Sequence, residues 1–299
     1  MASWKNTERI GKMIGTAQSI VLPTRGCSYD QCYMCSYSRD CPSLTPETIV
    51  ETFAESFDPS VDKVKIFTSG SFLDTKELTT DQVKRIADIV ASSDVHELCV
   101  ETRPEFVNEE ALVQIKDHLG GISLEVAMGL ESANDDVLTY YINKGFTYAD
   151  YETASTLIHA LDCRVKTYLL LKPPFMTEYE AMVDVVDSIR AIEKITDVIS
   201  INPVSIHKYT PLEQLWRKRS YRPPYLWSLV SCLNEVRKIG PHVMSHPVAV
   251  GRERGIHNCG SCEQEIMKQV ETYNLHGSAI DVSCPCKNEW ERELTKIFS

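Results

Sequence analysis

Six short apolar segments, separated by stretches whose apolar residues recur at helical spacing, run through the first two thirds of this 299-residue sequence. The apolar segments are typical of strands, and they are residues 17–24, 61–68, 96–102, 122–129, 164–171 and 197–204. Helices are predicted between them, one that begins at Pro46 with Thr45 as its N-cap and others over residues 80–92, 108–119, 147–161 and 178–194. Strands that alternate with helices form parallel sheets with right-handed crossovers, so the sequence predicts an α/β fold.

This alternation suits a doubly wound sheet or a partial barrel, and the residues at the strand ends favour the barrel. One polar residue there is often only a helix cap or a solvated loop residue. Several together indicate a site, because functional side chains of barrels collect at the carboxyl ends of the strands. The residues at these ends are Ser69, Gly70, Ser71, Glu101, Arg103, Glu131, Lys172, Asn202 and His207. We therefore expect residues 1–239 to form a partial (β/α)6 TIM-like barrel.

The pattern changes near residue 240, where His, Gly and Pro become frequent, and residues 240–299 are predicted to form a small metal-binding module. Four cysteines lie there in two close pairs, Cys259 with Cys262 and Cys284 with Cys286. Four thiolates suit structural Zn²⁺, and a four-cysteine [4Fe–4S] cluster is the alternative. Zinc is favoured because a module of this size has little core area and gains stability from a metal.

A second cysteine group, Cys27, Cys32 and Cys35, lies directly after the first predicted strand. Three thiolates leave one iron of a [4Fe–4S] cluster without a protein ligand, which chemistry on a bound cofactor requires. The same three could also be zinc ligands, with Cys41 as the fourth. A loop of a large α/β domain favours the iron–sulfur interpretation, because structural zinc sites usually occupy small modules.

Composition indicates the cellular compartment and the kinds of partner to expect. The chain has eleven cysteines, no export signal and no apolar run that could span a bilayer, so a cytoplasmic protein without a membrane partner is expected. Clustered cysteines in a reducing compartment are more often metal ligands than disulfides. A net charge of −11 disfavours tight nucleic-acid binding by the chain alone, although a partner could supply basic charge.

The segment TRGCSYDQCYMCSY at 24–37 resembles the cluster loop of radical S-adenosylmethionine (SAM) enzymes, with four residues between the first two cysteines instead of the commoner three. The resemblance implies a [4Fe–4S] cluster on Cys27, Cys32 and Cys35 whose free iron binds SAM. Reductive cleavage of SAM then gives methionine and a 5′-deoxyadenosyl radical that abstracts hydrogen from the substrate. An external electron donor is also implied.

The same resemblance gives the strand ends roles. Residues 69–71 (Ser69, Gly70, Ser71) would receive the SAM amino group, although the glutamate frequent in that motif is absent here. Glu101 and Arg103 would contact the SAM ribose or carboxylate. The segment GLES at 129–132 resembles Elongator-like enzymes and makes Glu131 a candidate SAM or substrate ligand. The candidate substrate contacts are Lys172, Asn202 and His207.

An ordered set of segments across most of the chain resembles the radical SAM subunits of archaeosine synthase. They are GSFLD at 70–74, ETRPEFV at 101–107, LLLKPPFMTE at 169–178, YRPPYLWSLV at 221–230, HNCGSC at 257–262 and CPCKNEW at 284–290. The resemblance implies that a partner subunit joins lysine to 7-cyano-7-deazaguanine in tRNA. This subunit would act as a lyase that breaks the lysine carbon–nitrogen bond and leaves archaeosine, with tRNA bound mainly through the partner.

Two alternatives remain. The first is another tRNA-modifying radical SAM enzyme, Elongator-like or methylthio-transferring. The second is a zinc-stabilised barrel that binds a partner or RNA without catalysis, and it predicts zinc at Cys27, Cys32 and Cys35 and no cleavage of SAM.

Overall fold

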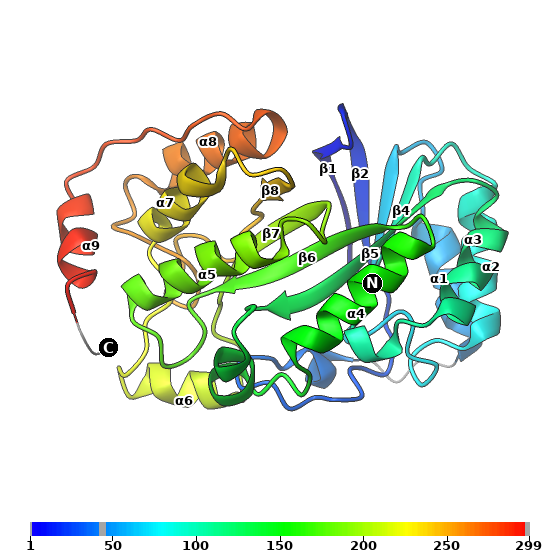
Figure 1. Cartoon of the computed structure of the whole chain (residues 1–299), viewed down its shortest axis with the longest axis horizontal. Helices are drawn as coiled ribbons and strands as arrows, with labels where there is room; N and C mark the ends of the chain where they lie inside the picture. Colours follow the sequence, from blue (N-terminus) through cyan, green and yellow to red (C-terminus); the bar gives the residue numbers. More distant parts are fainter. Residues whose placement is uncertain (1, 42–45, 297–299) are drawn as a thin grey trace. The chain divides into compact units, whose positions relative to one another are not determined.

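The computed structural model describes residues 2–41 and 46–296, and the chain forms two compact units that interleave in sequence (Figure 1). The first unit consists of Met1–Asp30, Tyr37–Gly129 and Ala149–Lys166. The second consists of Gln31–Ser36, Leu130–Tyr148 and Thr167–Ser299. These interleaved units do not test a boundary near residue 240, so the expected domains 1–239 and 240–299 stay a prediction.

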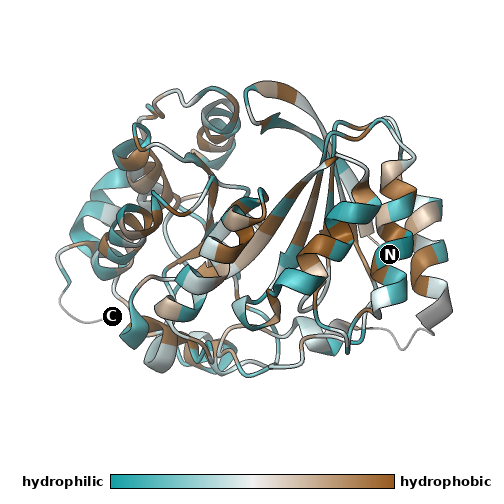
Figure 2. Cartoon of the chain, turned by 45° about the vertical axis from the view of Figure 1, so that its right-hand side comes forward, coloured by the Kyte–Doolittle hydropathy of each residue, from teal (hydrophilic) through white to brown (hydrophobic). Residues whose placement is uncertain are grey.

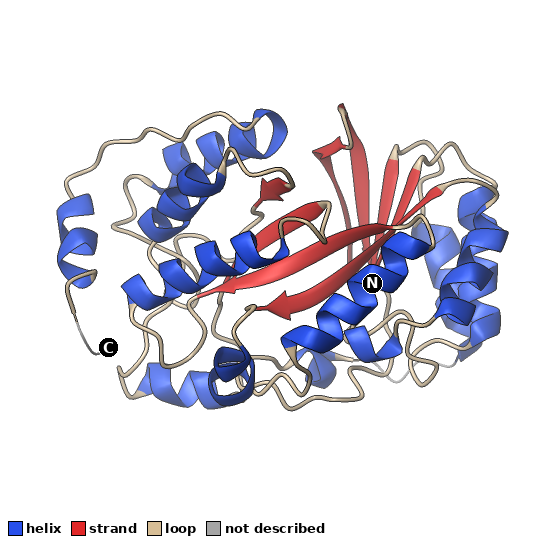
Figure 3. Ribbon diagram, in the orientation of Figure 1, coloured by secondary structure: helices blue, strands red, loops and turns tan. Residues whose placement is uncertain are grey.

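The predicted fold class, an α/β partial barrel, is confirmed. Eight strands follow one another in the sheet in chain order, and Figure 3 shows helices between most of them. The strands are β1 (Ala2–Ile10), β2 (Met13–Val21), β3 (Lys63–Phe67), β4 (Glu97–Thr102), β5 (Ser123–Glu131), β6 (Arg164–Leu171), β7 (Val198–Pro203) and β8 (His242–Met244). Neighbouring strands from β2 to β5 are parallel, as are β7 and β8.

The first strand was not predicted. β1 pairs antiparallel with β2 from Ala2 opposite Val21 to Ile10 opposite Met13, which leaves a two-residue turn. Gly11 has a φ of 58° in that turn, as a tight hairpin requires at its first central position. β1 is mostly exposed and polar, so it lacks the apolar signal of the inner strands. β2 also begins earlier than the predicted start at residue 17.

The predicted helices are confirmed to within two residues, and Thr45, the predicted N-cap of the first one, lies outside the described residues. The helices of the α/β alternation are α1 (Pro46–Ser56), α2 (Thr80–Ala91), α3 (Glu109–Leu119), α4 (Tyr148–Ala160) and α5 (Glu178–Ile192). Asn108 caps α3 by accepting a hydrogen bond from the Ala111 backbone at 2.9 Å. Thr177 and Glu180 form the expected capping box of α5.

Further helices follow the last two strands, β7 and β8. They are α6 (Pro211–Arg217), α7 (Leu226–Val236), α8 (Glu263–His276) and α9 (Lys287–Glu293), and a π-helix (Val137–Ile142) follows β5. In Figure 2 the strands carry much of the apolar colouring, whereas the helices alternate between apolar and polar, as amphipathic helices do. Among the described residues, no helix is both long and apolar enough to cross a membrane.

One set of strand residues in the first unit carries buried charge instead of apolar side chains. Lys63 on β3 lies 2.6 Å from both Glu97 on β4 and Glu125 on β5, and all three are at most 5% exposed. Lys65 pairs in the same way with Glu8 on β1. Burial alone would raise the pKa of Glu125, but Lys63 and its other basic neighbours lower it to about 2. Pairing with Lys63 therefore lets Glu125 keep its charge in this interior.

Candidate functional site

The cysteine loop follows β2, as predicted, and its three thiols are all partly exposed. Cys27 belongs to the first unit, whereas Cys32 and Cys35 belong to the second. The Cys35 backbone N–H donates to the Cys32 carbonyl at 3.2 Å and closes a turn. The Tyr33 N–H donates to Ile142 of the π-helix at 3.0 Å, and its carbonyl accepts from Leu212 of α6 at 3.1 Å. The second half of the loop is thus fixed to two other elements of its unit.

The first half of the loop lies against the turn after β3. A Cβ atom on Gly70 would come within 2.5 Å of the Cys27 Cα, so only glycine fits there. Beside this contact, Glu77 accepts hydrogen bonds from the Ser71 N–H and from the Thr24 hydroxyl, both at 2.6 Å. Burial raises the pKa of Glu77. Its carboxyl group therefore joins the start of the cysteine loop to residues 69–71.

Glu77 was not recognised from the sequence. It lies in the polar run DTKELTT at 74–80, where nothing marks one carboxylate as buried. The glutamate that radical SAM enzymes often carry in this motif is absent from residues 69–71. The structure places Glu77, six residues after Ser71, at the same turn.

Ser71 and Arg103 are held together at the ends of β3 and β4. The Ser71 hydroxyl accepts from the Arg103 N–H at 3.1 Å, and the Phe72 N–H donates to the Glu101 carbonyl at 2.7 Å. The Arg103 guanidinium lies over the Tyr29 ring, 4.3 Å from its centroid, and its Nε donates to Glu105 at 2.5 Å. Arg103 thereby connects the end of β4 to the cysteine loop. Ser69, Gly70 and Glu101 are more exposed than Ser71 and Arg103.

The strand ends of the second unit differ in how accessible their candidate residues are. Glu131 pairs with Lys144 at 2.8 Å and is partly exposed, as are Asn202 and His207. Lys172 is 3% exposed, and its ammonium group lies 2.7 Å from Glu178. Glu131 and Lys172 have φ angles of 75° and 65°, a conformation that is rare outside glycine and collects at functional sites.

Glu178 is the centre of a buried hydrogen-bond network that the sequence did not reveal. Its Oε1 accepts from the Tyr225 N–H at 2.7 Å and from the Ser228 hydroxyl at 2.6 Å. The same Ser228 oxygen accepts from the Trp290 indole at 2.8 Å. Lys172 is therefore connected through Glu178 and Ser228 to α9, the helix that begins after the last cysteine pair.

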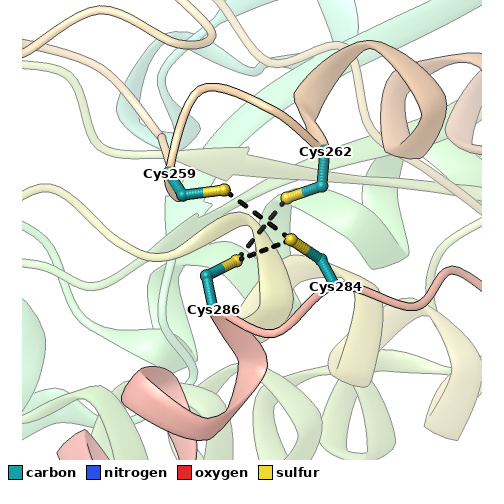
Figure 4. Close-up of side chains that lie close together, drawn as sticks. All are labelled: Cys259, Cys262, Cys284 and Cys286. Carbon is teal, nitrogen blue, oxygen red and sulfur yellow. Dashed lines mark hydrogen bonds between the residues drawn. The ribbon is translucent and has the colours of Figure 1, made fainter.

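The four cysteines of the C-terminal segment gather as predicted (Figure 4). Their Sγ atoms are 3.7 Å apart for Cys259 and Cys284, 3.8 Å for Cys262 and Cys286, and 3.5 Å for Cys284 and Cys286. Four thiolates placed tetrahedrally at 2.3 Å from one zinc ion would be about 3.8 Å apart. Thiolates on a [4Fe–4S] cluster bind four different irons and must spread further. The spacing therefore fits a single tetrahedral metal ion.

Neighbouring N–H groups also suit thiolates at this site. Asn258 Nδ2 donates to Cys262 Sγ, and the Trp227 indole donates to Cys286 Sγ, each at 3.3 Å. A hydrogen bond from the Ser261 backbone lowers the pKa of Cys259 to about 7. His257, which directly precedes this cysteine-containing segment, hydrogen-bonds the Gly255 carbonyl at 2.7 Å through Nδ1.

Three of the remaining cysteines are buried in other elements, and the fourth, Cys41, lies beside Gly26 of the first cysteine loop. Cys99 and Cys232 are buried, and burial raises the pKa of each thiol. Cys163 is buried too. The Cys41 thiol donates to the Tyr37 carbonyl at 3.4 Å.

Comparison with known proteins identifies the family. The model of the Radical SAM superfamily matches residues 21–189, more than half of the chain. Archaeosine synthase subunit beta of Thermococcus kodakarensis is 39% identical over 97% of this chain and 95% of that protein. The chain belongs to the archaeosine synthase subunit beta family of radical SAM enzymes. The subunit beta of Methanosarcina acetivorans is 35% identical over 98% of this chain and 89% of that protein.

Membership of this family confirms the resemblance found in the sequence, and it implies a [4Fe–4S] cluster and SAM as cofactors. Among solved structures, an N-terminally truncated Elp3 of Methanocaldococcus infernus aligns with a TM-score of 0.53 at 17% identity. That alignment covers 77% of this chain and 59% of the Elp3 chain, and it supports the radical SAM fold alone.

Proposed function

We propose that this chain is the radical SAM lyase of archaeosine formation. It would break the lysine carbon–nitrogen bond of a lysine adduct of 7-cyano-7-deazaguanine in tRNA, so that archaeosine remains on the RNA. The near full-length similarity to two archaeosine synthase beta subunits carries this proposal. A lysine-transferring partner subunit would supply the adduct, an external donor would supply electrons, and the cytoplasm is the expected compartment.

The residues of the cysteine loop fit the cofactors that the family implies. Cys27, Cys32 and Cys35 present partly exposed thiols within one short loop, and three thiolates leave one iron available to SAM. When bound, the cluster and SAM supply the radical chemistry that removes a hydrogen atom from the lysine side chain. Contacts with Gly70 and Arg103 fix the first half of the loop, and the hydrogen bonds of Tyr33 fix the second half.

The strand-end residues divide into positioning and contact roles. Ser69, Gly70 and Glu101 are the accessible candidates for SAM, while buried Ser71 and Arg103 hold the turn and the loop. Glu131, Asn202 and His207 are the accessible candidates for substrate. Lys172, expected as a substrate contact, is buried against Glu178 and is better explained as a positioning residue.

We also infer that Cys259, Cys262, Cys284 and Cys286 hold a structural zinc ion. The Sγ spacing near 3.8 Å supports this choice over a second cluster. The ion would tie α8 to α9, because Cys262 and Cys286 directly precede these two helices.

Metal analysis of the chain purified without oxygen tests both proposals. About four irons and one zinc are expected, whereas about eight irons without zinc would make the second group a cluster. Zinc alone, with no iron taken up on reconstitution, would favour the non-catalytic zinc-stabilised module.

Two variants separate the roles of the cysteine groups. Cys32→Ala should abolish conversion of adduct-bearing tRNA, followed by mass spectrometry of its nucleosides, and leave the unfolding transition nearly unchanged. Cys262→Ala should lose zinc and lower the stability broadly. Equal behaviour of the two variants would contradict this division. A methylthiolated product, or no product from the wild-type chain with its reductant and SAM, would contradict the lyase assignment.

A further inference from the structure

One stretch of the second unit is basic in an otherwise acidic chain. Residues 205–222 contain five basic residues and one acidic residue, whereas the whole chain has a net charge of −11. This stretch runs from the end of β7 through α6. Its exposed basic side chains are Lys208, Arg217, Lys218 and Arg219.

The single acidic residue of the stretch does not cancel this charge. Glu213 is buried, and it is paired with Arg254 at 2.6 Å and with Arg217 at 3.0 Å. The hydrogen bond from Arg254 is the main reason that the pKa of Glu213 falls to about 2. Within the described part of the chain, Lys218 and Arg219 have no ion pair. Their charges are therefore available to an anion from outside.

Four large aromatic side chains are exposed in the same unit, namely Tyr179 on α5 and three others on the segments that directly follow β5, β6 and β7. Tyr140 is 67% exposed, Phe175 is 53% exposed and Tyr209 is 71% exposed. Phe175 and Tyr209 have φ angles of 69° and 65°, which is unusual for bulky residues. Backbone strain of this kind persists where the surroundings hold it and is concentrated at functional sites. Here the Glu213 carboxylate holds the Tyr209 turn by accepting from its N–H at 2.8 Å.

The aromatic and basic residues lie on segments that follow β5, β6 and β7, and all three segments are connected. The Phe175 ring meets the Tyr141 ring of the π-helix edge to face, with centroids 6.2 Å apart. Tyr33 of the cysteine loop hydrogen-bonds both the π-helix and the first turn of α6. Figure 1 shows α6 beside the π-helix at the lower edge of the view. The surface thus borders the part of the loop that holds Cys32 and Cys35.

We propose that this surface binds a strand of the tRNA substrate. Lys208, Lys218 and Arg219 would contact phosphates, and the aromatic residues Tyr140, Phe175 and Tyr209 would stack on unpaired bases. Basic groups and exposed rings on connected segments are the combination that single-stranded nucleic acid requires. The centre of a protein–protein interface is instead depleted of charge.

This inference rests on the proposed function in one respect, which is that the bound RNA is the tRNA substrate. Enzymes that act on a base bind single-stranded nucleic acid or take the base out of the stack, and aromatic side chains can then stack on unpaired bases. The surface gives this chain its own RNA contact beside the one expected from the partner subunit.

Binding of a fluorescent, full-length tRNA transcript to the cluster-loaded chain tests the proposal. The double variant Lys218→Glu with Arg219→Glu should weaken binding by about tenfold or more and reduce the salt dependence by about two phosphate contacts. Tyr209→Ala should weaken binding by about tenfold, with the salt dependence unchanged. The matched control is Arg237→Glu with Lys238→Glu, which makes the same charge change on an exposed pair after α7. Figure 1 shows α7 well separated from α6 within the unit, and this control should weaken binding less than twofold.

Equal weakening by the two double variants, or no binding of tRNA by the wild-type chain, would overturn the proposal. Loss of partner-subunit binding with unchanged tRNA binding would show that the surface contacts protein instead. Cleavage of SAM without substrate should be the same in wild type and variants, which shows that the cofactor site is intact. If the wild-type chain binds tRNA at this surface but leaves the lysine adduct unconverted, the lyase assignment is wrong and the RNA-binding role of the surface is still supported.

Discussion

Replacing Glu178 with glutamine would leave the Lys172 ammonium group buried without its counter-charge. Both side chains are at most 4% exposed, and the pair is 2.7 Å long. Removing one partner of a buried ion pair typically costs about 3–5 kcal/mol, because the other charge stays desolvated. Glutamine keeps an oxygen that can accept from Tyr225 and Ser228, so we expect the lower end, about 3 kcal/mol of unfolding free energy.

Comparison with a double variant isolates that cause. Lys172→Met together with Glu178→Gln removes the uncompensated charge, so it should be more stable than Glu178→Gln alone by about 2 kcal/mol. Urea unfolding under anaerobic conditions, with the metal content measured beforehand, gives the free energies. The exposed Glu271→Gln on α8 is the control and should change stability by less than about 0.5 kcal/mol.

Two results would refute this reasoning. One is a Glu178→Gln variant as stable as the Glu271→Gln control, which would mean that Lys172 finds another partner or water. The other is a double variant no more stable than Glu178→Gln, which would trace the loss to the hydrogen bonds of Tyr225 and Ser228 instead of the charge.

Three further predictions follow from single contacts. Gly70→Ala should lower the iron content after reconstitution severalfold, because the added Cβ would come within 2.5 Å of the Cys27 Cα, whereas Gly240→Ala, with open space around it, should bind iron normally. Burial raises the pKa of Asp184 from 3.8 to about 6, so the folded state binds more protons than the unfolded state between these values, and stability should fall as pH rises from about 4 to 6. Asp184→Asn should flatten that dependence and stabilise the chain at pH 7 by about 1–3 kcal/mol, and an unchanged pH profile in urea unfolding would contradict the assignment. Trp227→Phe removes the N–H donor to Cys286, and we expect at least about tenfold faster loss of zinc to a chelator while tRNA binding is unaffected.

The sequence predicts best where local chemistry is enough. Asn108 and Thr177 mark helix starts because their side chains satisfy the backbone beside them. The four C-terminal cysteines lie together as predicted, because each close pair already places two thiols side by side and only the two pairs have to meet. β1 escaped prediction because its residues are polar, and pairing with β2 decides its structure.

The positions that sequence reasoning missed are decided by tertiary contacts. Glu77 and Glu178 resemble other acidic residues in polar runs, and only the fold buries them. Lys172 was predicted as a substrate contact for the same reason, although Glu178 follows it by only six residues. Spacing along the chain cannot show which of many carboxylates will meet a buried donor.

The buried pairs of Lys63 with Glu97 and Glu125 affect how the stability of the sheet changes with temperature. The cost of dehydrating charged groups falls as temperature rises, whereas the gain from apolar burial levels off. The carboxylates and the ammonium group therefore hold β3, β4 and β5 together more effectively in warm solution than in cold. An apolar interior of equal volume would gain little further strength once that contribution has levelled off, so the paired charges give these strands an advantage that grows with temperature.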